Sequence, residues 1–343
     1  MSTNPKIYVA GHRGLVGSAI VRMLERRGFN NIVTRPHKEL DLIDQRAVAG
    51  FFADEKPEYV FLAAAKVGGI LANSTRGAEF IYENLMIQTN ILHQSMVHPV
   101  KRLVFLGSSC IYPKMAAQPI KEEALLTGAL EPTNSPYAVA KIAGIEMCRA
   151  YNEQYGTSFV PVMPTNLYGP DDNFDLQTSH VLPAMIRKFH LGKLAMAGDW
   201  EGIETDEKRM GTIPSSIKDD IGYTHRDSSS CQITLWGTGS PRREFLHVDD
   251  MAEATGFAMF DTDATDLLNI GTGIDMTIRE TAALVADTVG YAGDIAWDHA
   301  LPDGTPRKVL DVNRITGLGW SHKIDLKQGL KQTYRSYLHA FSG

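Results

Sequence analysis

The sequence of 343 residues has few cysteines, no long apolar run and no excess of positive charge. Its three cysteines, Cys110, Cys148 and Cys231, are widely spaced and odd in number, which excludes a disulfide framework and a zinc-ligand pattern. No apolar run approaches the roughly 20 residues that a membrane-spanning helix needs. The polar start leads directly into a strand, without the apolar region of a secretory signal. We therefore expect a cytoplasmic protein with no membrane segment.

The formal net charge of −6 argues against a general nucleic-acid surface, so any functional basic groups must be locally concentrated. Hydrophobic residues make up 43% of the chain and charged residues 22%, which is typical of a globular protein. There are no repeats or low-complexity tracts. Because the chain exceeds the usual size of a single domain, we expect two domains.

Short apolar runs alternate with amphipathic segments through the first half of the chain. The runs at 6–11, 31–35, 59–65, 102–108 and 159–164 predict strands, and 15–28, 44–55, 75–98 and 136–156 predict helices. This alternation predicts an α/β domain with a doubly wound parallel sheet of the Rossmann type.

The pattern loosens after residue 174, where a second, smaller α/β substrate domain is expected. We assign residues 1–168 with about 244–266 to the first domain, and about 169–243 with 267–343 to the second. Residues 198–230 are polar and charged without a clear period, so they predict a functional or disordered segment.

A glycine motif follows the first strand. Gly11, Gly14 and Gly17 have the spacing that lets the backbone approach a pyrophosphate at a helix N-terminus. The second strand ends at Arg35, Arg13 lies in the glycine loop, and no carboxylate appears until Glu39. Two guanidinium groups favour the extra phosphate of NADP(H) over the ribose hydroxyl of NAD.

Tyr137 and Lys141 lie at i and i+4 of one predicted helix, so they share a face. A nearby ammonium would stabilise the phenolate and lower the pKa of the tyrosine. Ser108 or Ser109, at the end of the fourth strand, would polarise a substrate carbonyl beside it. Hydride transfer is the step that this set favours.

These features resemble the extended short-chain dehydrogenase/reductase family across nearly the whole chain. The resemblance is carried by "AGHRGLVGSAI", "LAAAKVGGI", "FLGSSCIYPK", "EPTNSPYAVAKIAGI", "MPTNLYGPDDNF", "REFLHVDDMA" and "PDGTPRK". It is strongest to members that epimerise two ring carbons of GDP-4-keto-6-deoxy-D-mannose and then reduce the ketone with NADPH, giving GDP-L-fucose.

The resemblance implies a role for each matching position. It makes Ser108, Cys110, Tyr137, Lys141 and His180 catalytic, with the cysteine and histidine serving as the acid–base pair of epimerisation. Lys188, Trp236, Arg243 and Asp303 would bind the GDP-sugar, and the protein would be a homodimer. The implied NADP-binding residues are Gly11, His12, Arg13, Gly14, Leu15, Val16, Gly17, Arg35, Leu40, Asp41, Leu42, Ala64, Lys66, Leu106, Gly107, Ser109, Lys141, Pro164, Thr165, Asn166, Leu167 and His180.

Cys110 is two residues beyond Ser108. If this segment is extended, both side chains face the same pocket. The unperturbed pKa of a thiol, about 8.5, is close enough to neutrality for acid–base work.

Other functions share parts of this pattern. A nucleotide-sugar 4-epimerase would retain NAD and would give no role to Cys110. A 4,6-dehydratase would need an acidic pair near the serines, where this chain has Ser109 and Cys110. A non-catalytic NADP-sensing protein would not need Ser108, Tyr137 and Lys141 together. The connection at 192–232 is longer than the compact link that is typical of the family. A lid, an oligomer contact and a disordered insertion are the alternatives for this segment.

Overall fold

The computed structural model describes residues 4–69, 75–301 and 303–339. Ile70 and Pro302, which belong to two of the quoted motifs, lie outside the described residues. The chain divides into two compact units. Unit 1 contains Met1–Leu167, Leu246–Gly273 and Leu310–Lys323, and unit 2 contains Tyr168–Phe245, Ile274–Val309 and Ile324–Gly343.

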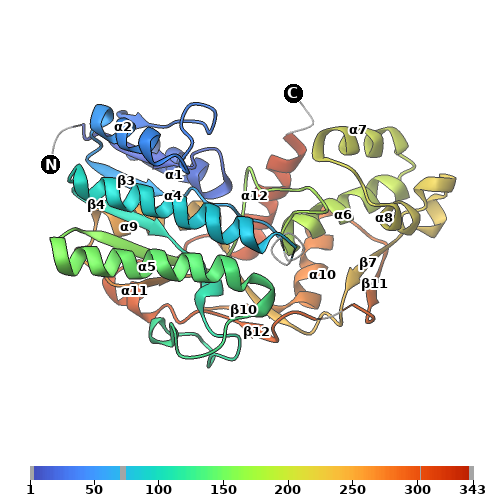
Figure 1. Cartoon of the computed structure of the whole chain (residues 1–343). Helices are drawn as coiled ribbons and strands as arrows, with labels where there is room; N and C mark the ends of the chain where they lie inside the picture. Colours follow the sequence, from blue (N-terminus) through green and yellow to red (C-terminus); the bar gives the residue numbers. More distant parts are fainter. Residues whose placement is uncertain (1–3, 70–74, 302, 340–343) are drawn as a thin grey trace. The chain divides into compact units, whose positions relative to one another are not determined.

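The elements of unit 1 alternate as the sequence predicts (Figure 1). They are β1 (Ile7–Ala10), α1 (Leu15–Arg26), β2 (Ile32–Val33), α2 (Gln45–Glu55), β3 (Tyr59–Leu62), α4 (Gly77–Val97), β4 (Arg102–Leu106), η1 (Ser109–Ile111), η2 (Glu122–Ala124), η3 (Pro132–Asn134), α5 (Ser135–Tyr155), β5 (Phe159–Pro164), α9 (Val248–Phe260), β9 (Leu268–Ile270) and α11 (Asn313–Leu318).

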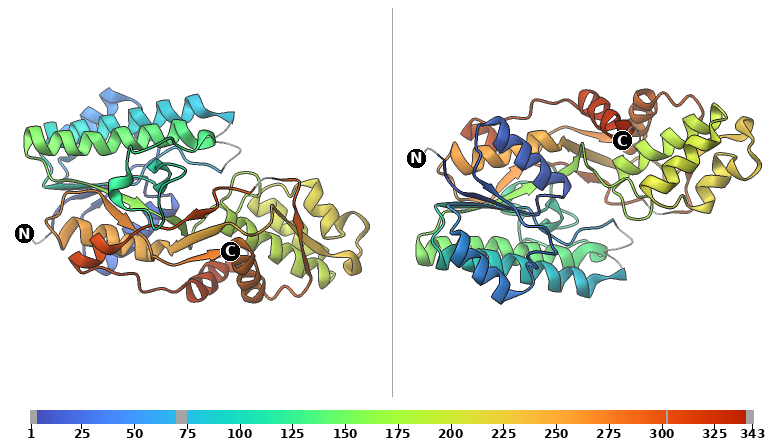
Figure 2. Two further views of the ribbon diagram at one scale, coloured as in Figure 1. Left: turned by 90° about the horizontal axis from the view of Figure 1, so that it is seen from below. Right: turned by 90° about the horizontal axis from the view of Figure 1, so that it is seen from above.

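Six strands form one parallel sheet in the order β2-β1-β3-β4-β5-β9. The residues of β1, β3, β4 and β5 are all buried, as expected for a sheet covered on both faces. Helices α4 and α5 run side by side over one face, and α1 and α9 pack together on the other (Figure 2). The predicted doubly wound parallel sheet is therefore confirmed.

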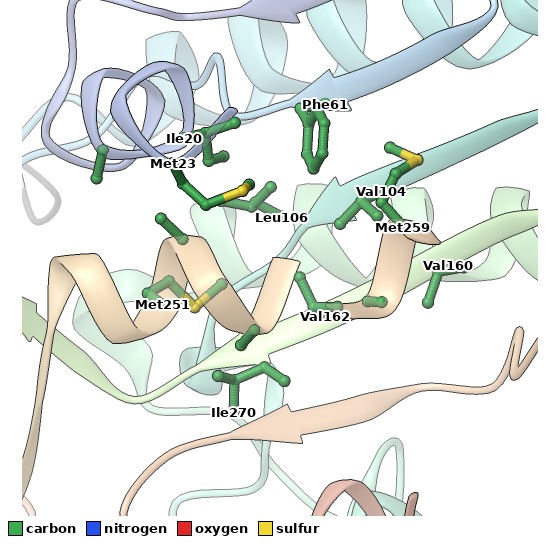
Figure 3. Packing of buried hydrophobic residues seen from close by; sticks show 14 of the residues in the cluster. Ile20, Met23, Phe61, Val104, Leu106, Val160, Val162, Met251, Met259 and Ile270 are labelled. Atoms are coloured by element: carbon green, nitrogen blue, oxygen red, sulfur yellow. The ribbon is translucent and has the colours of Figure 1, made fainter. Parts of the chain in front are cut away.

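A fully apolar layer joins α1 and α9 to the sheet. Figure 3 shows Met23 of α1 and Met251 and Met259 of α9 near Val104 and Val162, whose side chains point from β4 and β5. These residues have exposed fractions of 2% or less. This packing stabilises the sheet, and the ends of its strands position the residues described below.

Unit 1 receives two segments that the sequence analysis assigned to the second domain. Residues 267–273 contain β9, which extends the sheet by pairing with β5, and Leu310 forms a bridge with Ile120. The predicted boundary differs here because pairing between strands far apart in the sequence has no local signal.

The chain passes from one unit to the other within β6 (Asn166–Tyr168) and again within β8 (Arg242–His247). The elements of unit 2 are α6 (Val181–Met196), α7 (Trp200–Met210), α8 (Ser215–Asp220), η4 (Tyr223–His225), η5 (Ser228–Ser230), β7 (Gln232–Trp236), β10 (Asp275–Thr277), α10 (Ile278–Val289), β11 (Asp294–Asp298), β12 (Arg307–Lys308) and α12 (Leu326–His339). Strands β7 and β11 pair in parallel, and β10 and β12 flank β8. No helix among the residues with described coordinates has the length and apolarity needed to cross a membrane.

The polar stretch at 198–230 is folded, which excludes the disordered alternative and leaves a functional role as a prediction. It contains α7 and α8, and Ile203, Ile213, Ile217 and Ile221 enter the core of unit 2. Four isoleucines among many charged residues give too weak an apolar period for a prediction from sequence. Tertiary contacts stabilise these short helices instead.

A buried ion pair fastens α7 to α6. Arg187 Nε donates to Asp206 Oδ1 at 2.8 Å, and both side chains have an exposed fraction of 0%. The remaining guanidinium donors bind the carbonyl oxygens of Phe174, Met210 and Gly211, and Asp206 also accepts from the Tyr337 hydroxyl. The charges are thus compensated on every side.

We expect Asp206→Ala to lower the free energy of unfolding by about 3–5 kcal/mol, because it leaves the Arg187 guanidinium buried without its counter-ion. Urea denaturation followed by tryptophan fluorescence measures the change. The control is Glu207→Ala, which removes the half-exposed partner of Lys218 and should cost no more than about 1 kcal/mol. Equal losses in the two variants would contradict the expectation.

Candidate active site

The glycine loop, residues 11–17, requires its glycines for steric reasons. Gly11 has φ +84°, and a Cβ there would lie 2.6 Å from the Ala64 backbone nitrogen. A Cβ on Gly17 would overlap the Gly11 carbonyl oxygen. Gly14 is the N-cap of α1 and supplies no side-chain cap, so a bound pyrophosphate can occupy the helix N-terminus. The loop therefore fits a dinucleotide.

The predicted cofactor residues of unit 1 follow the carboxyl ends of parallel strands. The glycine loop follows β1, Leu40–Leu42 follow β2, Ala64 and Lys66 follow β3, and Gly107 follows β4. Pro164 ends β5, and Thr165, Asn166 and Leu167 come next. Carboxyl ends of parallel strands share one edge of a sheet, which is where such folds bind ligands.

Arg13 and Arg35 differ in their surroundings. Arg13 is exposed. Arg35 forms an ion pair with Glu55, donates to the Thr34 carbonyl oxygen, and lies 5.6 Å from the centre of the Phe51 ring. The ion pair with this carboxylate of α2 was not expected from the sequence. Its contact with the cofactor phosphate stays a prediction, and a bound phosphate would compete with Glu55 for it.

Buried amides of α4 hold two of the cofactor loops, and the sequence analysis missed them. Asn90 Nδ2 donates to the carbonyl oxygens of Leu42 and Ile43 at 2.9 and 3.1 Å. Asn84 accepts from the Lys66 N–H and donates to its carbonyl oxygen, both at 3.0 Å. Amide residues among the apolar positions of the helix were the available signal, because buried polar groups need partners.

The segment after β4 turns sharply instead of extending. Ser108 is the N-cap of η1, and its Oγ accepts from the Cys110 backbone N–H at 3.4 Å. The expectation that Ser108 and Cys110 alternate along an extended segment was therefore wrong. The hydroxyl competes for a backbone donor and closes the chain into a turn, as serine commonly does at such positions.

Lys141 is buried beneath this turn. Its Nζ donates to the Leu106 carbonyl oxygen at 2.8 Å and lies 4.8 Å from the centre of the Phe105 ring and 5.9 Å from that of Tyr137. Burial lowers the pKa of Lys141 to about 8, while a charge on Cys110 opposes this shift. The ammonium therefore carries its charge at neutral pH and begins to lose it in mildly alkaline solution.

Tyr137 does not have the lowered pKa that the sequence analysis predicted. Burial raises its pKa well above the ordinary value, a charge on Cys110 adds to the rise, and a hydrogen bond with Ser108 opposes it. Desolvation of the phenolate thus outweighs any benefit from the nearby lysine. The phenol stays protonated at neutral pH, which is the form that donates a proton.

Cys110 is half-buried and acts on both of these groups. Because its charge would raise the pKa of Tyr137 and of Lys141, the thiol lies close to the pair. Cys148, by contrast, is fully buried in the apolar core. The segment after β4 is a turn and not the expected extended chain, yet one site still contains Ser108, Cys110, Tyr137 and Lys141.

His180 belongs to unit 2. It is the N-cap residue of α6, its side chain makes no capping hydrogen bond, and it is exposed. Its position is compatible with a mobile proton carrier, and its partnership with Cys110 stays a prediction.

The other predicted substrate residues also lie in unit 2, in two groups. Arg243 donates to the Thr305 carbonyl oxygen at 2.6 Å, and Asp303 accepts from the Thr238 backbone and hydroxyl at 2.9 and 2.7 Å. Burial lowers the pKa of Arg243, and Asp303 opposes this shift. The sequence analysis missed Thr238, which follows the sharply turned Gly237 and anchors Asp303.

The second group is formed by α6 and β7. Lys188 Nζ donates to the Thr234 carbonyl oxygen at 3.2 Å. Trp236, two residues further along β7, has an exposed fraction of 68%, whereas Ile233 and Leu235 on the opposite face are in the core. An exposed indole and an ammonium on neighbouring elements suit a nucleotide and its diphosphate.

Comparison with known proteins agrees with this geometry. A model of the NAD dependent epimerase/dehydratase family matches residues 7–271. The chain is 52% identical to a putative GDP-L-fucose synthase of Arabidopsis thaliana over 98% of this chain and 93% of the relative. It is 49% identical to the GDP-L-fucose synthase of Escherichia coli K12 over 97% and 96%.

A solved structure of a GDP-D-glycero-L-gluco-heptose synthase from Campylobacter jejuni, determined in the presence of NADPH, is also similar. It matches with a TM-score of 0.87 and 43% identity, covering 98% of this chain and 99% of that one. The chain described here belongs to the NAD dependent epimerase/dehydratase family.

Proposed function

We propose that this protein is an NADPH-dependent epimerase-reductase that converts GDP-4-keto-6-deoxy-D-mannose to GDP-L-fucose. The observation that carries the proposal is the Cys110 thiol beside Tyr137 and Lys141. Ketone reduction alone needs only the serine, tyrosine and lysine. A further acid–base group in that position supports proton exchange at the carbons next to the ketone. The similarity to GDP-L-fucose synthases supports the same substrate.

The epimerisation is assigned to Cys110 and His180. Cys110 removes a proton from a ring carbon next to the ketone, and His180 returns one from the opposite face. Hydrogen bonds from Ser108 and Tyr137 to the ketone oxygen stabilise the enolate charge as it forms. Repetition at the carbon on the other side of the ketone completes the double epimerisation.

Reduction uses the same oxygen contacts. Bound NADPH supplies the hydride. Tyr137, which is held protonated, donates its proton to the oxygen, and the Lys141 ammonium stabilises the phenolate that is left. Gly11 and Gly17 leave room for the cofactor's pyrophosphate, and Arg13 and Arg35 would select the phosphate of NADP.

The proposal predicts rapid NADPH oxidation, measured by absorbance, with GDP-4-keto-6-deoxy-D-mannose and at least a tenfold lower kcat/KM with the UDP analogue. Product analysis by NMR should identify GDP-L-fucose. A 4-epimerase would instead give no net NADPH oxidation. Reduction without epimerisation would contradict the role of Cys110.

We also propose a homodimer formed through α4 and α5. Tyr82 and Val97 of α4 and Val139 and Tyr155 of α5 are exposed apolar side chains on these two adjacent helices. A second copy would cover them and make a bundle of four helices. Cys110, Cys148 and Cys231 are not paired in disulfides, as expected for a cytoplasmic location.

A further inference from the structure

We propose that Asp220, in the α7–α8 segment, is a positioning residue that holds the Lys188 ammonium for the diphosphate of the GDP-sugar. This inference rests on the proposed function. It assigns a role to the long connection at 192–232, which the reaction mechanism leaves unexplained.

The contacts converge on one residue of β7. Lys188 Nζ donates to the Thr234 carbonyl oxygen at 3.2 Å, and the Thr234 backbone N–H donates to Asp220 Oδ2, also at 3.2 Å. The carboxylate and the ammonium thus meet the same peptide residue from α8 and α6. Trp236, a predicted contact of the nucleotide, lies two residues further along the same strand.

Polar contacts attach the α7–α8 segment, residues 200–220, to α6, and Asp220 is its last residue. Arg187, the residue before Lys188, forms the buried ion pair with Asp206 of α7. The next residue, Glu207, pairs with Lys218 of α8 at 2.8 Å and accepts from the Ile213 N–H at 3.0 Å. These links join α6, α7 and α8, so that Asp220 is presented to Lys188 by a folded scaffold.

A counter-ion is needed because Lys188 is desolvated. Burial lowers the pKa of Lys188, and the charge on Asp220 opposes that shift. Asp220 also acts on Cys231 and Tyr291, but the pKa values of both groups are raised, chiefly by burial, so they are neutral near neutral pH. Asp220 therefore favours the protonated form of Lys188, which is the form that attracts a diphosphate.

The test is the affinity for GDP-L-fucose, measured by calorimetry from pH 6.5 to 9 without NADP(H). The diester phosphates of this probe stay ionised over that range. In Asp220→Asn, which can still accept from Thr234, we expect affinity to be lost at a lower pH than in the unaltered protein. The loss of affinity should therefore be larger at the alkaline end of this range than at the acidic end.

Asp219→Asn is the matched control, because it removes the same charge from the adjacent, exposed position. It should leave the pH profile unchanged. In a Lys188→Ala background, Asp220→Asn should have no further effect on affinity, since the residue acts through the ammonium. Equal profiles for the two asparagine variants, or additive losses in the double variant, would overturn the inference. Absence of GDP-L-fucose binding by the unaltered protein would overturn the proposed function instead.

Discussion

Replacing Tyr137 with phenylalanine is expected to lower kcat for ketone reduction by about 10³-fold, within the range typical of a lost general acid. The phenol is protonated at neutral pH and hydrogen-bonded to Ser108, and the Lys141 ammonium lies 5.9 Å from the centre of its ring. Without the hydroxyl, no proton is delivered to the ketone oxygen as the hydride arrives. The rate is measured by NADPH oxidation under single-turnover conditions.

Two measurements separate this effect from misfolding. The affinity of Tyr137→Phe for NADPH should stay within about 3-fold of the unaltered protein, because the glycine loop is untouched. Tyr151→Phe, further along α5, removes a hydroxyl that bonds His93 and should retain full activity. If Tyr137→Phe kept most of its kcat, Tyr137 could not be the proton donor.

Replacing Cys110 with serine is expected to slow epimerisation by about 10²- to 10³-fold. A hydroxyl is a far weaker acid than a thiol, so it cannot remove the proton next to the ketone at neutral pH. Incorporation of solvent deuterium at the two ring carbons, followed by NMR, reports this step directly. NADPH binding should be unchanged.

Cys231→Ser is the matched control, because it removes a half-buried thiol from the other unit and should leave deuterium incorporation intact. Unchanged incorporation in Cys110→Ser would exclude the thiol from proton transfer. A second substrate, which already has the final ring configuration, tests reduction separately. If Cys110→Ser reduces it but exchanges no deuterium, Cys110 acts in epimerisation alone.

Local patterns were sufficient for most of unit 1. The strands β1, β3, β4 and β5 are short, buried and contain valine or isoleucine, and Gly11 and Gly17 occupy positions where a side chain would collide with the backbone. Apart from the contact of Gly11 with Ala64, such constraints act within a few residues of each other. The helical spacing of Tyr137 and Lys141 is equally local, so their common face could be predicted.

The predictions failed where distant segments decide the outcome. The lysine was expected to lower the pKa of Tyr137, but burial of the phenol, beside Phe80 of α4, has the larger effect. The helices α7 and α8 were not predicted, because their sequences are mostly polar. They are stabilised by the ion pair with Arg187 and by four isoleucines that pack in the core of unit 2. Arg35 was expected to bind the phosphate of NADP, and in the structure it forms an ion pair with Glu55.

By itself, the sequence of this protein determined the alternating α/β plan and the dinucleotide loop, and it led to the prediction of the reacting groups. These depend on covalent geometry, helical periodicity and side-chain chemistry, all of which are local. Only the tertiary structure decided how far each ionisable group is removed from water and which carboxylate meets which cation. Those properties follow from the surroundings of a folded side chain, and proton transfer depends on them.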